Sequence, residues 1–193
     1  MDLAMQPTFT APFTRSGISF PGLPVLPDNI ERHVVPGGGS RALEVEAGDV
    51  VNVMDVSGLQ AVELVHFTPD GISDAAMISS VGKGAANGLH NTLSTGGANG
   101  ARIMHLLDTA GFSLSAADSV DLFNGESVAG EIRSVTVIAG GLLCISAPGG
   151  PMSPEFQNVA TEVIVFIERI NPRSQADQLK APAPLAAPLL DDC

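Results

Sequence analysis

The sequence predicts a mostly β fold with a helical insertion, in the α+β class, built as an antiparallel β-barrel or sandwich. Two observations carry this prediction. Most periodic segments alternate as strands do, and the clearest helical pattern lies between two groups of such segments. With 193 residues, 45% of them hydrophobic and 16% charged, the chain is long enough for one domain with a sizeable core.

The first group of predicted strands consists of three neighbouring segments. Residues 41–46 alternate between apolar and polar side chains, residues 50–56 are rich in valine, and residues 61–67 form a third β-rich segment. The pairs Gly48-Asp49 and Ser57-Gly58 between them are typical turn residues. These segments therefore predict consecutive strands joined by tight turns.

The second group lies near the C-terminus. Residues 132–138 and 142–146 repeat the strand pattern, and residues 159–170 (VATEVIVFIERI) form the strongest strand signal in the chain. The centre of this last segment is apolar at successive positions. Because only a strand buried on both faces needs that pattern, it predicts a central strand.

Between the two groups lies the helical insertion. The segment ANGARIMHLLDTAGF places apolar residues at helical spacing, with Gly111 as its C-terminal cap. A second short helix is expected over residues 115–122, where Ser115 would cap and Asp118 would complete a capping box.

Two segments resemble each other within the chain. Residues 43–53 and residues 135–145 share the order strand, Ala-Gly turn, strand. Two interpretations stay open: the segments are pseudo-symmetric halves of one barrel, or they show a coincidence that is common among β-hairpins.

Composition divides the chain into three parts. Residues 1–30 are predicted to be an extended Pro/Gly-rich arm that buries Phe9, Phe13 and Phe20 on the domain or on a neighbouring subunit. Residues 31–171 are predicted to form the β-barrel-like domain. Residues 172–193 are rich in Pro and Ala, which is typical of a linker or tail.

Charge and hydropathy exclude several classes of partner. The formal net charge of −12 repels polyanions, and the chain lacks the Trp and Tyr side chains that stack on bases, so we expect no nucleic acid partner. No apolar run reaches the ~20 residues that span a bilayer, and the N-terminus lacks a signal-peptide pattern. We expect a cytoplasmic homo-oligomer without membrane contact.

No metal site or nucleophile is predicted in this chain. The histidines at 33, 66, 90 and 105 stand apart, without the spacing of a metal motif. Cys144 lies in an apolar run and is interpreted as a buried small hydrophobe. No Ser nucleophile elbow is present.

One group of polar residues is a candidate site. Asp55, Gln60, Glu63 and His66 follow one another around the third predicted strand and its preceding turn. The competing interpretation is a polar strand end that faces solvent or a domain interface.

The segment 34–67 resembles the urea carboxylase-associated domain family. The resemblance rests mainly on turn residues, and Glu63 occupies a position where that family usually has an acid. The segment is similar in particular to the first domain of long bacterial proteins that end in a folate-binding aminomethyltransferase-like module, among them trimethylamine N-oxide demethylases. That likeness extends over most of residues 31–170. The matching residues are Pro36, Gly37, Ala47, Gly48, Asp49, Asp55, Gly58 and Gln60.

The chain departs from this family at a metal ligand. Family members with a zinc site place a thiolate just after the glutamine, where this chain has Ala61. Zinc needs three or four ligands at fixed geometry. The resemblance therefore implies that zinc and tetrahydrofolate are held only by other domains of a longer protein, and that this chain binds no cofactor.

Three functional hypotheses follow. The first is a non-catalytic structural or assembly domain of a multidomain tetrahydrofolate-linked demethylase that forms dimethylamine and formaldehyde, with the chemistry in the following domains. The second is a small subunit of a two-chain hydrolase for urea- or guanidine-like substrates. The third is a binding module for a small cationic or amide ligand. In the first two, the partners are further domains of the same protein or a partner subunit, and the chain alone is not expected to be an enzyme.

Overall fold

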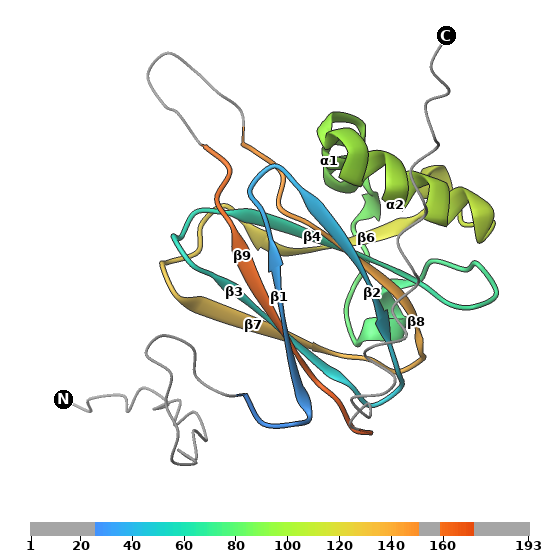
Figure 1. Cartoon of the computed structure of the whole chain (residues 1–193), viewed down its shortest axis with the longest axis horizontal. Helices are drawn as coiled ribbons and strands as arrows, with labels where there is room; N and C mark the ends of the chain where they lie inside the picture. The colour runs from blue at the N-terminus through green and yellow to red at the C-terminus, as the bar shows by residue number, and fades with distance from the viewer. Residues whose placement is uncertain (1–25, 151–158, 172–193) are drawn as a thin grey trace, which may run out of the picture.

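A computed structural model describes residues 26–150 and 159–171, and these form two antiparallel β-sheets packed face to face (Figure 1). Sheet A has the strand order β1-β9-β3-β7, and sheet B has the order β2-β8-β4-β6-β5. The strands are β1 (Ile30–Val35), β2 (Ser40–Val45), β3 (Val50–Asp55), β4 (Ala61–Phe67), β5 (Gly84–Ala85), β6 (Asp118–Asn124), β7 (Glu131–Thr136), β8 (Gly141–Ser146) and β9 (Val163–Glu168). Most of the predicted arm and all of the predicted tail lie outside the described residues.

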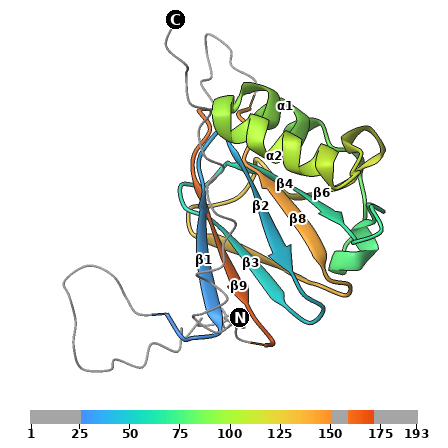
Figure 2. The same cartoon turned by 45° about the vertical axis from the view of Figure 1, so that its right-hand side comes forward.

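The helices of the described chain cover the outer face of sheet B. They are α1 (Asn87–Thr95) and α2 (Gly97–Thr109), with short 3-10 turns at Ala75–Ile78 and Leu114–Ala116. Figure 2 shows the resulting layers, with β1 and β9 on one side of the molecule and both helices on the other. No helix in the described residues has the length and apolar content needed to cross a membrane.

The layers create two apolar clusters. Side chains such as Val51, Val165 and Ile145 are fully buried between the sheets. A second cluster, which includes Phe67 and Leu89, lies between sheet B and the helices. Because side chains alternate along a strand, sheet B contributes apolar side chains to both clusters.

The prediction of a mostly β, antiparallel fold with a helical insertion is confirmed, in its sandwich form. The barrel alternative is wrong, because the described strands form two separate sheets and not one continuous ladder. The prediction of a central strand at residues 159–170 is also confirmed, since β9 lies between β1 and β3.

The strand order contains an internal duplication. Strands β1 to β4 and strands β6 to β9 pass through the two sheets in the same way, with the sheets exchanged. The pairs β1·β9, β9·β3 and β3·β7 thus correspond to β6·β4, β4·β8 and β8·β2. The two similar sequence segments are β2–β3 and β7–β8. Each crosses from one sheet to the other, so the pairing supports the pseudo-symmetric interpretation and not the hairpin one.

Two arginines at equivalent positions bridge the seams between the sheets. Arg41 on β2 donates to the carbonyl of Val34 on β1 at 3.2 Å. Arg133 on β7 donates to the carbonyl of Leu122 on β6 at 2.6 Å and lies over the Phe123 ring, 4.8 Å from its centroid. In each half an edge strand of one sheet is therefore tied to a strand of the other by a charged hydrogen bond.

One local prediction around the insertion is wrong, and one helix there was not predicted. The helix expected over residues 115–122 is wrong: a short turn ends at Ala116 and β6 begins at Asp118. Val120 and Phe123 are buried within sheet B, and this packing outweighs the local capping pattern. Helix α1 was not expected, because its sequence NGLHNTLST buries only Leu89, Thr92 and Leu93.

Replacing Arg133 tests the seam. We expect Arg133→Met to lower the free energy of unfolding by about 1–2 kcal/mol, because it removes a charge-assisted hydrogen bond and a cation–π contact. Arg102→Met on the exposed side of α2 is the matched control and should change it by less than about 0.5 kcal/mol. Equal urea midpoints for the two variants would show that the contacts of Arg133 across the seam contribute nothing to the free energy of unfolding.

Candidate functional site

Asp55 organises the turn that follows β3. Its buried carboxylate accepts hydrogen bonds from the backbone N–H of Gly58 at 2.9 Å, from that of Gln60 at 3.0 Å and from the Ser127 hydroxyl at 2.5 Å. These bonds hold Leu59 at φ 61°, a left-handed conformation that is uncommon for a branched residue, with 51% of its surface exposed.

Gln60 joins this turn to the loop between β8 and β9. Its side-chain amide donates to the carbonyls of Ala61 at 2.6 Å and Pro148 at 2.8 Å, while Oε1 accepts from the N–H of Thr161 at 2.6 Å. Both amide hydrogens are used. The structure thus brings Asp55 and Gln60 together, as a link between the two halves of the sandwich.

Glu63 lies on the face of β4 that α1 covers. Its Oε2 accepts the backbone N–H of Leu89 at 2.5 Å, and its side chain is buried. The residue that precedes α1 makes no side-chain cap within the described chain, so Glu63 supplies a negative cap from the sheet. Gly88 allows this approach, since a Cβ there would lie 3.0 Å from the carboxylate.

Glu63 belongs to a polar row across sheet B. Strand register places Ser40 opposite Ser146, Ser146 opposite Glu63, and Glu63 opposite Asp121. Asp121 forms an ion pair with Lys83, whereas the buried Ser40 hydroxyl has no hydrogen-bond partner among the described residues. We call Ser40, Ser146, Glu63 and Asp121 the polar row. Its first three members are buried, and Glu63 is already bonded to Leu89.

His66 points to the opposite face of β4, away from Glu63. Its side chain is 1% exposed, and neither ring nitrogen has a hydrogen bond of good geometry within the described part of the chain. Burial lowers the pKa of His66 more than the nearby Ala139 carbonyl and Asp74 carboxylate raise it. His66 is therefore neutral at pH 7 and is separated from the polar row.

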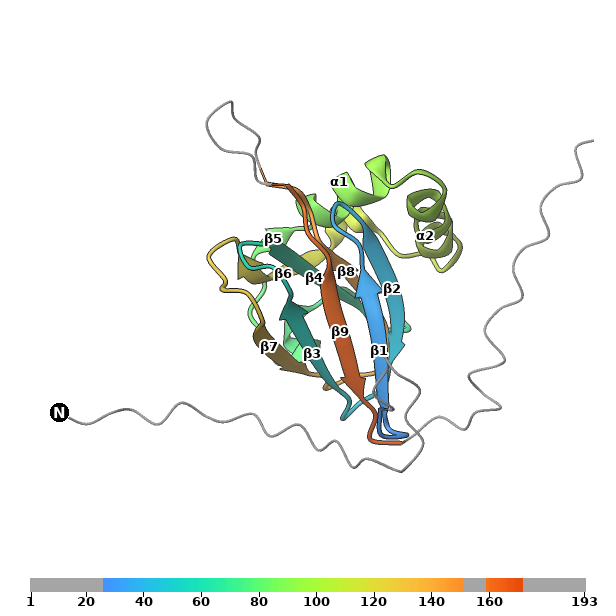
Figure 3. The same cartoon turned by 60° about the vertical axis from the view of Figure 1, so that its left-hand side comes forward.

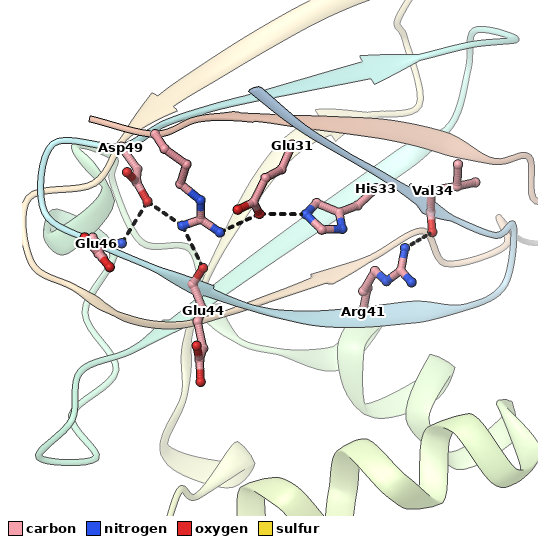
Figure 4. Close-up of polar contacts among 8 residues, drawn as sticks. Glu31, His33, Val34, Arg41, Glu44, Glu46 and Asp49 are labelled. Carbon is pink, nitrogen blue, oxygen red and sulfur yellow. Dashed lines mark hydrogen bonds and ion pairs between the residues drawn. The ribbon is translucent and has the colours of Figure 1, made fainter. Parts of the chain in front are cut away.

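A separate group of buried charge surrounds Arg169, and Figure 4 shows its partners Asp49, Glu44 and Glu31. The Arg169 guanidinium bonds Asp49 at 2.6 Å and Glu31 at 2.7 Å, and it donates to the carbonyl of Glu44 at 3.0 Å. The side chains of Arg169 and Asp49 are only 3% and 1% exposed. His33 contacts Glu31 at 3.3 Å from the other side.

Electrostatics within this group favour the charged forms of the paired residues. Burial raises the pKa of Glu31, but the bonds and charges of Arg169 and His33 outweigh it and lower the pKa overall. Burial opposes the charge on Arg169, yet Glu31 and Asp49 raise its pKa. This group leaves no local pattern in the sequence, because Arg169 and its partners are far apart in the chain.

Metal ligands are not gathered in the described chain. Among residues 26–150 and 159–171, no group of three or more His, Cys, Asp or Glu residues is placed to hold a metal ion. Cys144 is fully buried, and burial raises the pKa of its thiol to about 12. Its interpretation as a small hydrophobe is confirmed, while Cys193 lies outside the described residues.

Comparison with known proteins finds one extensive sequence similarity. The chain is 35% identical over 176 residues to a protein of Ruegeria pomeroyi named trimethylamine-oxide aldolase. This match covers 91% of the chain but 22% of that relative, so the chain spans about a fifth of the relative's length. A DUF1989 family protein of Silicibacter pomeroyi, known from a crystal structure, is 18% identical with a TM-score of 0.45, covering 72% of this chain and 78% of that one. No family model matches the chain.

These comparisons correct the first functional hypothesis. The similarity to the urea carboxylase-associated domain family is not confirmed, since no family model matches. The expectation of a tetrahydrofolate-linked demethylase is contradicted, because the matched relative is named an aldolase, which is a lyase and not a folate-linked enzyme by that name. The part of the hypothesis that is confirmed is the similarity to a protein that is named for trimethylamine oxide.

Removing the guanidinium of Arg169 tests the buried charge group. Arg169→Met should lower the free energy of unfolding by about 3–5 kcal/mol, because it leaves Asp49 and Glu31 without their counter-charge. Adding Asp49→Asn to this variant should restore part of the loss. A urea midpoint no lower than that of Arg102→Met, the exposed control, would contradict this account.

His66 should make stability depend on pH. The pKa of His66 in the folded chain is lowered from its ordinary value of 6.5. At a pH between the folded and the unfolded pKa, the unfolded chain therefore binds more protons than the folded chain. The free energy of unfolding falls on acidification through that range. His33, whose pKa is also lowered, acts in the same direction. His66→Leu should flatten the dependence below pH 6.5 in urea titrations. An unchanged slope in His66→Leu would refute the assignment.

Proposed function

We propose that this chain serves an aldolase-type lyase that acts on trimethylamine N-oxide or a related tertiary amine oxide. The observation that carries the proposal is its 35% identity over 176 residues to the protein named trimethylamine-oxide aldolase. Because the match covers 91% of the chain, it extends beyond any single motif.

The chemistry of such a lyase balances without a co-substrate. Trimethylamine N-oxide contains all the atoms of dimethylamine and formaldehyde. In the cleavage, the N–O bond breaks together with one C–N bond and one C–H bond of the same methyl group. That carbon forms a double bond to the oxygen, and its hydrogen passes to the nitrogen. No oxidant, reductant or acceptor is consumed.

The chain would act as one folded unit of a longer enzyme. It spans about a fifth of its relative's length, so further residues of the same protein or of a partner subunit would complete the site. Within the chain, the polar row suits an amine oxide, whose nitrogen carries positive charge and whose oxygen carries negative charge. The Ser40 hydroxyl would donate to such an oxygen, and the Glu63 carboxylate would lie near such a nitrogen.

A chimera tests this function. This chain would replace the matched segment of the Ruegeria pomeroyi protein, and formaldehyde release from trimethylamine N-oxide would be measured without added folate. We expect the chimera to retain activity. Glu63→Gln or Ser40→Ala in the chimera should lower kcat/KM about tenfold, as expected for one lost polar contact in the transition state.

Two controls separate the parts of the proposal. Glu162→Gln, at an exposed position, should leave kcat/KM unchanged. A folded but inactive chimera would overturn the assigned function. An active chimera with unaffected Glu63→Gln and Ser40→Ala variants would overturn only the role of the polar row.

A further inference from the structure

The outer face of sheet A is not covered by any described helix. Figure 3 shows β7, β3, β9 and β1 side by side, in contrast to sheet B, whose outer face carries α1 and α2. Strand alternation assigns one set of side chains to this face. Its apolar members are Ile30, Val34, Val50, Met54, Ile132, Ile164 and Phe166, and its polar members are Arg32, Asn52, Ser134, Thr136 and Glu168.

An apolar row crosses all four strands of this face. Strand register aligns Val34 with Ile164, Ile164 with Met54, and Met54 with Ile132. Ile132 at the edge is 37% exposed and Phe166 in the next row is half-buried, whereas Ile164 on the central strand is only 8% exposed. Such a continuous apolar row facing outward is typical of a surface that another segment covers.

Charge on this face differs from the charge of the whole chain. Among the described strand residues, the face carries one cation, Arg32, and one anion, Glu168, so it is neutral within a chain of net charge −12. An apolar occupant without net charge therefore meets no electrostatic penalty there.

The size of the face favours an occupant from the same chain. Four strands spaced ~4.8 Å apart, each six residues long at ~3.3 Å per residue, give a face of roughly 20 by 20 Å, or about 400 Å². A stable interface between separate proteins buries about 800 Å² on each partner. A tethered segment needs less, because its effective concentration is in the millimolar range.

We propose that residues 1–25 dock on the outer face of sheet A of the same molecule. This segment joins the described chain at Leu26, four residues before Ile30 on the edge strand β1. The ten residues from Phe20 to Ile30 can span up to about 33 Å, which exceeds the width of the face. The segment contains Phe9, Phe13 and Phe20, and its only charged side chains are Asp2 and Arg15.

A spin label on the segment tests the docking in the full-length chain. Thr14→Cys in a Cys193→Ser background would be labelled with a nitroxide, and Cys144 is buried and does not react. The methyl NMR signals of Met54, Ile132 and Ile164 should lose intensity. The signal of Met104 on α2 should keep its intensity, and dilution should not change the pattern.

Variants and mixtures decide between occupants. Ile132→Asp should restore the Met54 and Ile164 signals, whereas Ile138→Asp, 57% exposed and outside this face, should not. Intensity loss that appears only when a labelled chain is mixed with an isotope-labelled, spin-free chain would show docking on a second copy and overturn the proposal. Loss at α2, or none on the face, would also overturn it.

Discussion

The buried guanidinium of Arg169 lies where three parts of the chain meet. It comes from the end of β9, and it bonds Glu31 of β1 and Asp49 of the turn between β2 and β3. A buried charge without partners is strongly unfavourable. The three segments must therefore come together before the guanidinium and the two carboxylates can neutralise one another. Asp49 also accepts the N–H groups of Glu46 and Ile170. The group therefore fixes the point at which the chain crosses from sheet B to sheet A.

The duplicated topology explains why a sandwich with two open seams is nevertheless ordered. Each half places an arginine, Arg41 or Arg133, at the start of the segment that crosses between sheets. The insertion that contains α1 and α2 breaks the symmetry, because it covers sheet B alone. The same asymmetry leaves the outer face of sheet A to another occupant.

The polar residues around β4 show how similar side chains acquire different roles. Asp55 and Gln60 use their hydrogen-bonding capacity on backbone groups of neighbouring loops, which holds the exposed Leu59 in place. Glu63 caps a helix that lies above the sheet, and His66 is buried on the other face, without a hydrogen-bond partner among the described residues. Of the four, only Glu63 belongs to the polar row, for which we propose a contact with the amine oxide.

The sequence by itself determined the strands that are apolar at successive positions, because this pattern can be recognised without the rest of the chain. The segment around β9 is apolar at successive positions, and a central strand is the structure that buries both of its faces. The Ala-Gly turns and the burial of Cys144 were equally predictable, because short-range patterns carry them. Asp55, Gln60, Glu63 and His66 could be named from the sequence. The face of the sheet on which each side chain lies depended on strand register.

Only the tertiary structure decided the remaining features. Residues 118–124 have a plausible helix start, yet they pair with β4 because Val120 and Phe123 are buried there. Arg169 finds its carboxylates, and Ser40 its place beside Ser146, through contacts between residues far apart in the chain. Such long-range pairings leave no periodic signal, since the free energy that selects them comes from burial and charge neutralisation after the sheets have formed.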